Sequence, residues 1–138
     1  VSVYVKNELR GCIGRLETTT QLYISVHDMA KAAAMHDTRF KPVSKEEIDS
    51  LSLEISVLTP LKKISSVNEI IPGRHGILIK KDNRSGTFLP QVAQRTGWTT
   101  EEMLQQCSER KAGLGPDGWK HAEIYIYEVL IISDKPEN

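Results

Sequence analysis

The first third of the chain alternates between apolar and polar positions and then changes to a helical spacing. Residues 1–6 alternate and are rich in β-branched and aromatic side chains, which predicts a strand. A tight turn leads into a second predicted strand over residues 9–16, so the chain opens with a hairpin. Apolar residues then recur at helical intervals up to about His36, which predicts a helix capped by the threonines at 18–20.

The remainder of the chain predicts short strands and helices. Ser44 and Glu47 fit a capping box that starts a short helix, and Thr99 with Glu102 fits a second one. The last predicted strand, 123–132, is largely apolar on both faces, so we expect it to lie centrally beneath helices. The other elements expected after residue 50 are strands at 51–59, 76–81 and 87–89, and helices at 90–95 and 99–112.

Hairpins dominate this order of elements, and no strand–helix–strand rhythm is visible. The sequence therefore predicts an α+β fold with a mostly antiparallel β-sheet flanked by helices. A length of 138 residues fits a single domain spanning residues 1–138. The chain opens directly on a strand pattern without a methionine, and we infer that upstream sequence is missing.

Composition excludes several classes of function. Basic and acidic residues number 18 each, and no basic run is long enough to follow a phosphate backbone, so we do not expect nucleic-acid binding. No apolar stretch has the length of a membrane span and no signal peptide is visible, so we expect no membrane association. Cys12 and Cys107 do not form a disulfide framework, which favours the cytoplasm, and mid-helix Cys107 is expected to pack.

The most informative segment is 9–14, Leu-Arg-Gly-Cys-Ile-Gly, because it places a lone thiol between two glycines. Alternation along a strand puts Arg10, Cys12 and Gly14 on one face and the other three residues on the opposite face. Two glycines indicate a bulge or a close approach by a ligand or another backbone. The charge of Arg10 favours a nucleophilic thiolate, and the backbone N–H groups of Gly11 and Gly14 suit an oxyanion or carboxylate.

The motif itself contains no base. The candidates are His75, beside a glycine at a strand entrance, and then His36 and Glu54. Arg39 adds a second positive charge if its loop folds over the hairpin, and arginine suits bidentate capture of a carboxylate or phosphate. Gln91, at the start of a predicted helix, can face either a cleft or solvent.

Structural explanations of the same residues stay open. Cys12 can be a small buried apolar residue, and Arg10 or Arg39 can belong to surface ion pairs. His75 is also typical of a turn histidine. A metal site built from Cys12, His75 and a carboxylate lacks the usual ligand spacing, so we expect neither a metal nor a cofactor.

Residues 9–14 resemble the signature of the AMMECR domain family. Residues 37–40 are similar to its Asp-Pro-Arg-Phe segment, with Thr38 in place of the usual proline. The resemblance implies an α+β fold with a main antiparallel sheet, a smaller second subdomain and a cleft near the motif. It also implies an N-terminal helical segment before the first strand, which we expect this chain to lack. Further similar segments, which extend the resemblance over nearly the whole chain, are 53–60, 73–77, 87–92 and 110–114.

The resemblance implies no settled reaction, and it links microbial members to Memo-like and radical-SAM proteins as possible partners. Together with the residues, it favours an enzyme acting on a small molecule, with Cys12, His75 and Glu54 as catalytic residues. The alternative is a non-catalytic protein-binding or scaffold module that uses the same cleft. The residues expected to bind an anionic group of the substrate are Arg10, Gly11, Gly14, Arg39, Phe40 and Gln91.

Overall fold

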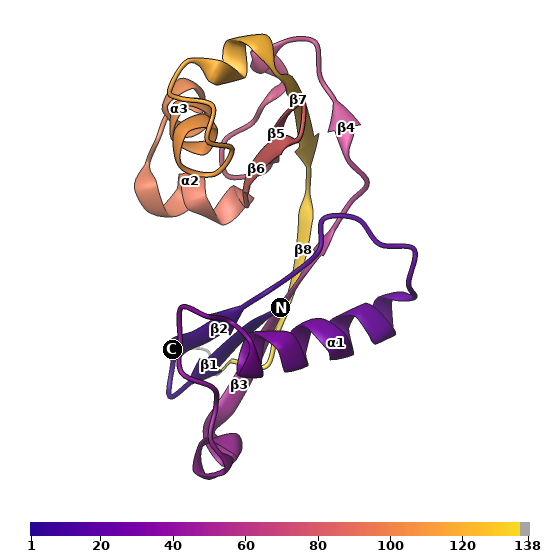
Figure 1. Cartoon of the computed structure of the whole chain (residues 1–138), viewed down its shortest axis with the longest axis vertical. Helices are drawn as coiled ribbons and strands as arrows, with labels where there is room; N and C mark the ends of the chain where they lie inside the picture. The colour runs from indigo at the N-terminus through magenta and orange to yellow at the C-terminus, as the bar shows by residue number, and fades with distance from the viewer. Residues whose placement is uncertain (136–138) are drawn as a thin grey trace. The chain divides into compact units, whose positions relative to one another are not determined.

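The computed structural model describes residues 1–135, which form two compact units. The first unit contains Val1–Val57 and the residues from Leu130 onward, and the second contains Leu58–Val129. Each unit contains a four-stranded sheet with helices beside it (Figure 1). The predicted α+β class with mostly antiparallel pairing is therefore confirmed, although the strands form two sheets.

The sheet of the first unit has the order β2-β1-β3-β8, and β1 pairs antiparallel with both β2 and β3. The predicted opening hairpin is present. Its two turn residues, Lys6 and Asn7, have φ angles of 49° and 67°, as a type I′ turn requires at both central positions. The strands of this sheet are β1 (Ser2–Val5), β2 (Glu8–Cys12), β3 (Leu51–Leu58) and β8 (Val129–Ser133).

Helix α1 (Leu22–Met35) packs on β1 and β2 of this sheet (Figure 1). The contact is closest at Gly11, where a Cβ atom would lie only 1.8 Å from the carbonyl oxygen of Ala33. Val3, the partner of Gly11 on β1, and Ala33 are both buried. Gly11 is therefore required because the backbone of the helix touches the backbone of the strand.

Two predicted boundaries in the first unit are wrong. Strand β2 ends at Cys12, several residues before the expected end at residue 16. Helix α1 begins after Gln21, and no side chain caps its first turn. The Thr18 hydroxyl instead accepts a hydrogen bond from the N–H of Thr20, so it stabilises a local turn that precedes the helix.

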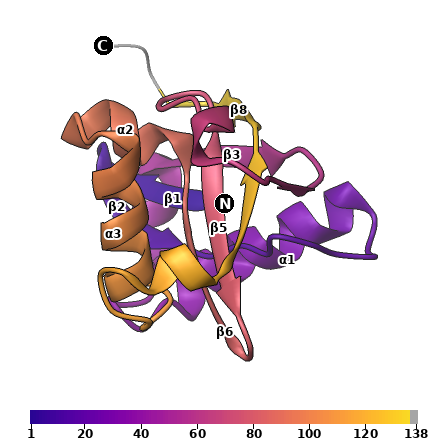
Figure 2. The same cartoon turned by 90° about the horizontal axis from the view of Figure 1, so that it is seen from above.

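The sheet of the second unit has the order β4-β7-β5-β6. Helices α2 and α3 lie together beside β5 and β6 (Figure 2), and their contact buries Ile77, Leu104 and the predicted packing residue Cys107 completely. The strands are β4 (Lys62–Lys63), β5 (Gly76–Lys81), β6 (Arg84–Phe88) and β7 (Glu123–Tyr127), the helices are α2 (Pro90–Thr96) and α3 (Thr100–Arg110), and the 3₁₀ turns are η2 (Val67–Glu69) and η3 (Gly118–His121).

The predicted single strand over residues 123–132 is two strands, β7 and β8, in different sheets. They are separated at Glu128, whose N–H donates to the Thr59 hydroxyl and whose carbonyl accepts from the Thr59 N–H. The expectation of a central position holds for β7, which lies between β4 and β5. It is wrong for β8, an edge strand with exposed apolar side chains at Leu130 and Ile132.

The contact between Gly11 and Ala33 leads to a stability prediction. Gly11→Ala should lower the free energy of unfolding by about 3 kcal/mol, because the added methyl group overpacks the interface between strand and helix. Gly14→Ala is the matched control: its nearest atom would lie 4.0 Å away, so we expect a change within about 0.5 kcal/mol. Urea denaturation followed by circular dichroism measures both, and equal stabilities would contradict the packing assignment.

Candidate functional site

Cys12 is the last residue of β2, the outermost strand on one side of the first sheet. Its neighbour in the strand, Gly11, faces α1, so the Cys12 side chain points to the opposite face. The thiol is half-buried and free. The hydroxyl of Ser2, directly across from it on β1, donates a hydrogen bond of 3.2 Å to Sγ and orients the sulfur.

Strand register extends this contact into a polar row. Ser2 pairs with Cys12 on one side and with Glu54 of β3 on the other. Residues directly opposite one another on neighbouring strands point to the same face, with Cβ atoms about 5 Å apart. Cys12, Ser2 and Glu54 therefore form a row across three strands on the face away from α1, and all three are half-buried. This row contains two of the three predicted catalytic residues, with Ser2 between them.

The outer edge of β2 is closed by side chains from the loop that follows α1. The N–H of Cys12 donates to Asp37 Oδ2 at 2.9 Å, and the guanidinium of Arg39 donates to the carbonyl of Cys12 at 3.1 Å. Arg39 also donates to both carboxylate oxygens of Asp37, at 2.9 and 2.7 Å. We refer to Asp37 and Arg39 as the edge clamp. It satisfies the backbone groups of Cys12 as a further strand would.

The carboxylate and the guanidinium of the edge clamp stabilise each other's charged form. The Asp37 side chain is only 6% exposed, and the hydrogen bonds from the Arg39 guanidinium and the Cys12 N–H hold its pKa well below the usual range. The hydrogen bond to Asp37 in turn raises the pKa of Arg39. The guanidinium carbon also lies 5.5 Å from the centre of the Phe40 ring, a cation–π geometry. The charge of Arg39 is thus paired, although its side chain is 60% exposed.

Arg10 is held by a different set of contacts. A bulge leaves it without a partner on β1, because Gly11 pairs with Val3 and Leu9 pairs with Tyr4. Its guanidinium forms an ion pair with Glu47 and donates to the carbonyl of Lys41. The bulge also places Leu9 on the Cys12 face, so the predicted division of the motif between two faces is wrong. Arg10 joins the hairpin to the segment around η1 (Lys45–Ser50), which has the predicted capping box.

Two predicted site residues belong to the second unit. His75 closes a turn. Its ring Nδ1 accepts from the backbone N–H of Ile71 at 3.1 Å, and its backbone N–H donates to the carbonyl of Ile71. Gln91 lies in the first turn of α2, and its Oε1 is buried without a hydrogen-bond partner among residues 1–135. Neither belongs to the polar row, which is built from β1, β2 and β3 alone.

These features define an α+β protein with a cysteine motif on the edge strand of one of its two sheets. The AMMECR1 family model matches residues 1–132, and the chain belongs to this family. It is 39% identical over 141 residues to Protein MK0488 of Methanopyrus kandleri, covering 96% of this chain and 68% of that protein. Protein TK0174 of Thermococcus kodakarensis is 43% identical over 124 residues, covering 86% and 60%.

A similar structure is known from crystallography. The uncharacterized protein PH0010 from Pyrococcus horikoshii superposes with a TM-score of 0.88 at 35% identity, covering 97% of this chain and 71% of that one. None of these three proteins is named for an activity. Within residues 1–135, no helix is long and apolar enough to cross a membrane, and no three His, Cys, Asp or Glu side chains are grouped to hold a metal ion.

The edge clamp makes stability sensitive to acid. The pKa of Asp37 is lower in the folded chain than its unfolded value of about 3.9, so its stabilisation is complete above that value and is lost as pH falls toward the folded pKa. We expect the free energy of unfolding to decrease as the pH drops below about 4, and we expect this decrease to be smaller in Asp37→Asn. Urea denaturation across that range measures the slope.

A control separates this effect from general acid sensitivity. The exposed carboxylate of Asp28 contacts the neighbouring His27 and makes none of the bonds of the edge clamp, so Asp28→Asn should keep the acid slope of the unmodified chain. If Asp37→Asn and Asp28→Asn have the same slope below about pH 4, the edge clamp is not the source of the pH dependence.

Proposed function

We propose that this protein is an enzyme that acts on a small molecule, with Cys12 as its nucleophile. The polar row of Cys12, Ser2 and Glu54 carries the proposal, because it supplies a thiol, an orienting hydroxyl and a proton acceptor in sequence across one face. Nucleophilic cysteines need a partner that takes up their proton and a third group that fixes the geometry. Sequence alone supplied Cys12 and Glu54, and the register adds Ser2 between them.

The row fits an acyl-transfer step. Sγ of Cys12 attacks an electrophilic carbonyl carbon, so that a sulfur–carbon bond forms and the leaving group departs with its electron pair. The Ser2 hydroxyl, which donates to Sγ at rest, rotates, accepts the thiol proton and gives its own proton to the Glu54 carboxylate. The protonated Glu54 gives this proton to the departing group. Water then attacks the acyl carbon, its proton passes to the Glu54 carboxylate, and the same route returns that proton to the released Cys12 thiolate. Ser2 carries the proton between Cys12 and Glu54 in this scheme, whereas Cys12 forms the covalent bond to the substrate.

Arg39 is the better placed of the two arginines to bind an anionic group of the substrate. Its guanidinium stays 60% exposed while it is bonded to Asp37, so a substrate carboxylate can approach the open side of the guanidinium without displacing Asp37. Phe40 offers an apolar surface beside it. Arg10 is less exposed and joins backbone segments, so it positions the strand that carries Cys12.

A non-catalytic protein-binding module is the second candidate. The pairing of both arginines favours it, because neither guanidinium is left without a counter-charge. Its partner would be a Memo-like or radical-SAM protein, as the family resemblance implies. In that case Cys12→Ser should retain partner binding and Arg10→Ala should abolish it.

Acylation of the thiol tests the enzyme proposal. We expect mono-p-nitrophenyl succinate to acylate Cys12 with a burst of p-nitrophenolate, and Glu54→Gln or Ser2→Ala to slow the burst about tenfold or more through loss of proton transfer. Intact mass identifies the modified thiol. Cys107 should stay unmodified in the folded chain, because it is fully buried and burial raises the pKa of its thiol to about 12.

Glu8→Gln provides the matched control, because Glu8 is an exposed carboxylate on the same strand as Cys12 but outside the row. Its burst should match that of the unmodified chain. Equal bursts in Glu54→Gln and Glu8→Gln would remove Glu54 from the reaction. Acylation of Cys12 no faster than that of free glutathione would overturn the enzyme proposal and favour the binding module.

A further inference from the structure

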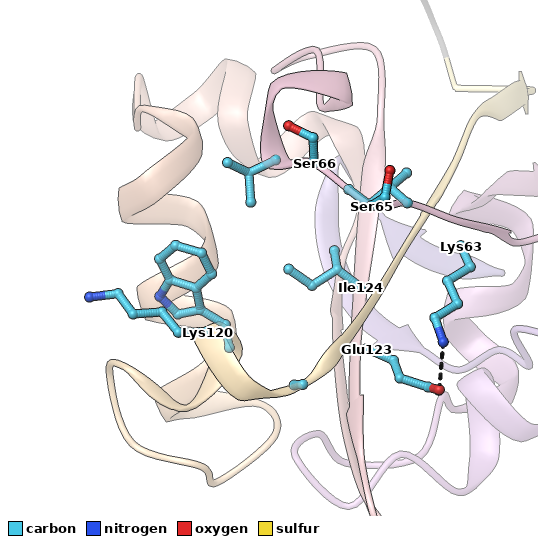
Figure 3. A pocket seen from close by; sticks show the side chains of 10 residues that line it. Lys63, Ser65, Ser66, Lys120, Glu123 and Ile124 are labelled. Carbon is cyan, nitrogen blue, oxygen red and sulfur yellow. Dashed lines mark hydrogen bonds and ion pairs between the residues drawn. The ribbon is translucent and has the colours of Figure 1, made fainter.

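The second unit contains a hollow beside Trp119 that lies outside the proposed reaction site (Figure 3). Its volume is about 310 Å³, and it lies between the segment from Lys63 to Val67 and the segment from Trp119 to Ile124. A second hollow of about 300 Å³, bounded by η2 and the start of α3, shares Val67 and Trp119 with it. Ligand pockets in proteins begin at about this size, which suits a small molecule.

The floor of the hollow is apolar. Ile124, only 9% exposed, belongs to the core of the second unit, and Val67 and Trp119 pack against the same core. The flat indole of Trp119 forms one wall. A planar apolar group has a matching surface here, because aromatic faces stack in offset arrangements.

The polar groups around the floor are mainly hydrogen-bond donors. Figure 3 shows Lys120 on one side of the hollow and Lys63 on the other, with Ser65 and Ser66 along a third side. Such a lining favours a ligand that is rich in acceptor atoms.

The carboxylate of Glu123, which lines the hollow, already accepts two hydrogen bonds from within the protein. Glu123 accepts from the ammonium of Lys63 at 2.8 Å (Figure 3) and from the hydroxyl of Tyr125 at 2.8 Å. Glu123 therefore fixes one rim of the hollow and offers little to a ligand. Its negative charge is balanced by Lys63, which leaves the ammonium of Lys120 as the remaining charge of the lining.

The backbone of Ser65 and Ser66, along one side of the hollow, is held by hydrogen bonds within the protein. Glu69 accepts from the N–H groups of Ser65 and Ser66, at 3.1 and 3.3 Å, and these bonds hold the pKa of Glu69 below its ordinary value. Ser66 Oγ caps η2 by accepting from the N–H of Asn68. The backbone is thus ordered by its own contacts, so a ligand does not need to order it.

Lys120 can exchange its present partner for a ligand. It forms an exposed ion pair with Asp117 at 2.7 Å, and its ammonium lies 5.6 Å from the centre of the Trp119 ring. Exposed ion pairs contribute little to stability, so a competing anion displaces Asp117 at small cost. The cation beside the indole brings an anionic group and a planar group to adjacent positions.

We infer that the Trp119 hollow binds a small molecule with a planar apolar body and an oxyanion group, a carboxylate or a phosphate. The planar body packs between Trp119 and Ile124. The oxyanion pairs with Lys120, whose side chain points away from the hollow in Figure 3 and turns from Asp117 toward the bound ligand. This site belongs to the second unit and does not depend on the reaction proposed at Cys12.

Nuclear magnetic resonance of the two indole N–H groups tests the inference with benzoate, phenyl phosphate and benzyl alcohol as probes. We expect benzoate, phenyl phosphate or both to shift the Trp119 signal saturably, while the Trp98 signal serves as an internal reference. Lys120→Gln should weaken this binding about tenfold, because it removes a charged hydrogen-bond donor. The matched control is Lys111→Gln: Lys111 also lies over an aromatic ring, 5.7 Å from the centre of Phe88, but outside the hollow.

Each outcome decides a separate point. A response to only one anionic probe assigns the oxyanion as carboxylate or phosphate. Equal binding of benzyl alcohol, or equal affinity in Lys120→Gln and Lys111→Gln, would overturn the role of the anion. No saturable shift of Trp119 with any probe would overturn the site. Cys12→Ser should bind the probes unchanged, which keeps this result independent of the acylation experiment.

Discussion

The first unit depends on the direct contact between the backbone of Gly11 and the carbonyl of Ala33. Helix α1 lies so close to β2 that only a residue without a side chain fits there, and the next residue, Cys12, must then face the other side of the sheet. The same contact determines where the helix ends relative to the strand. Asp37 lies four residues after Ala33, just beyond the end of α1, and its carboxylate reaches the N–H of Cys12.

Local features of the fold could be predicted from the sequence, whereas the partition of strands between sheets could not. The capping boxes at Ser44 and Thr99 depend on residues three positions apart, and both are present. The positive φ of Gly97 at the end of α2 is equally local. The division of 123–132 between two sheets depends on Thr59, which pairs with Glu128 from a distant part of the chain, and an apolar run contains no signal for that exchange.

The candidate site, like the fold, could be predicted from the sequence only where it depends on local features. Cys12 and Glu54 could be selected from residue type and strand pattern. Ser2 could not, because regular pairing from the type I′ turn would place Gly11 opposite it, and only the bulge at Arg10 brings Cys12 there. The partners of the arginines were also hidden: Glu47 is 37 positions from Arg10. The sequence indicates which groups are reactive, and long-range pairing decides which of them meet.

The edge clamp makes the β2 edge of the first sheet different from its β8 edge. At Cys12 the outward backbone groups of β2 are occupied by side chains of Asp37 and Arg39, so the strand of another molecule finds no free donor or acceptor there. Thr38, between them, contributes none of these bonds, which explains why a residue other than proline is accommodated at that position. A border sealed by two side chains keeps the thiol at the rim of a sheet without making that rim a starting point for aggregation.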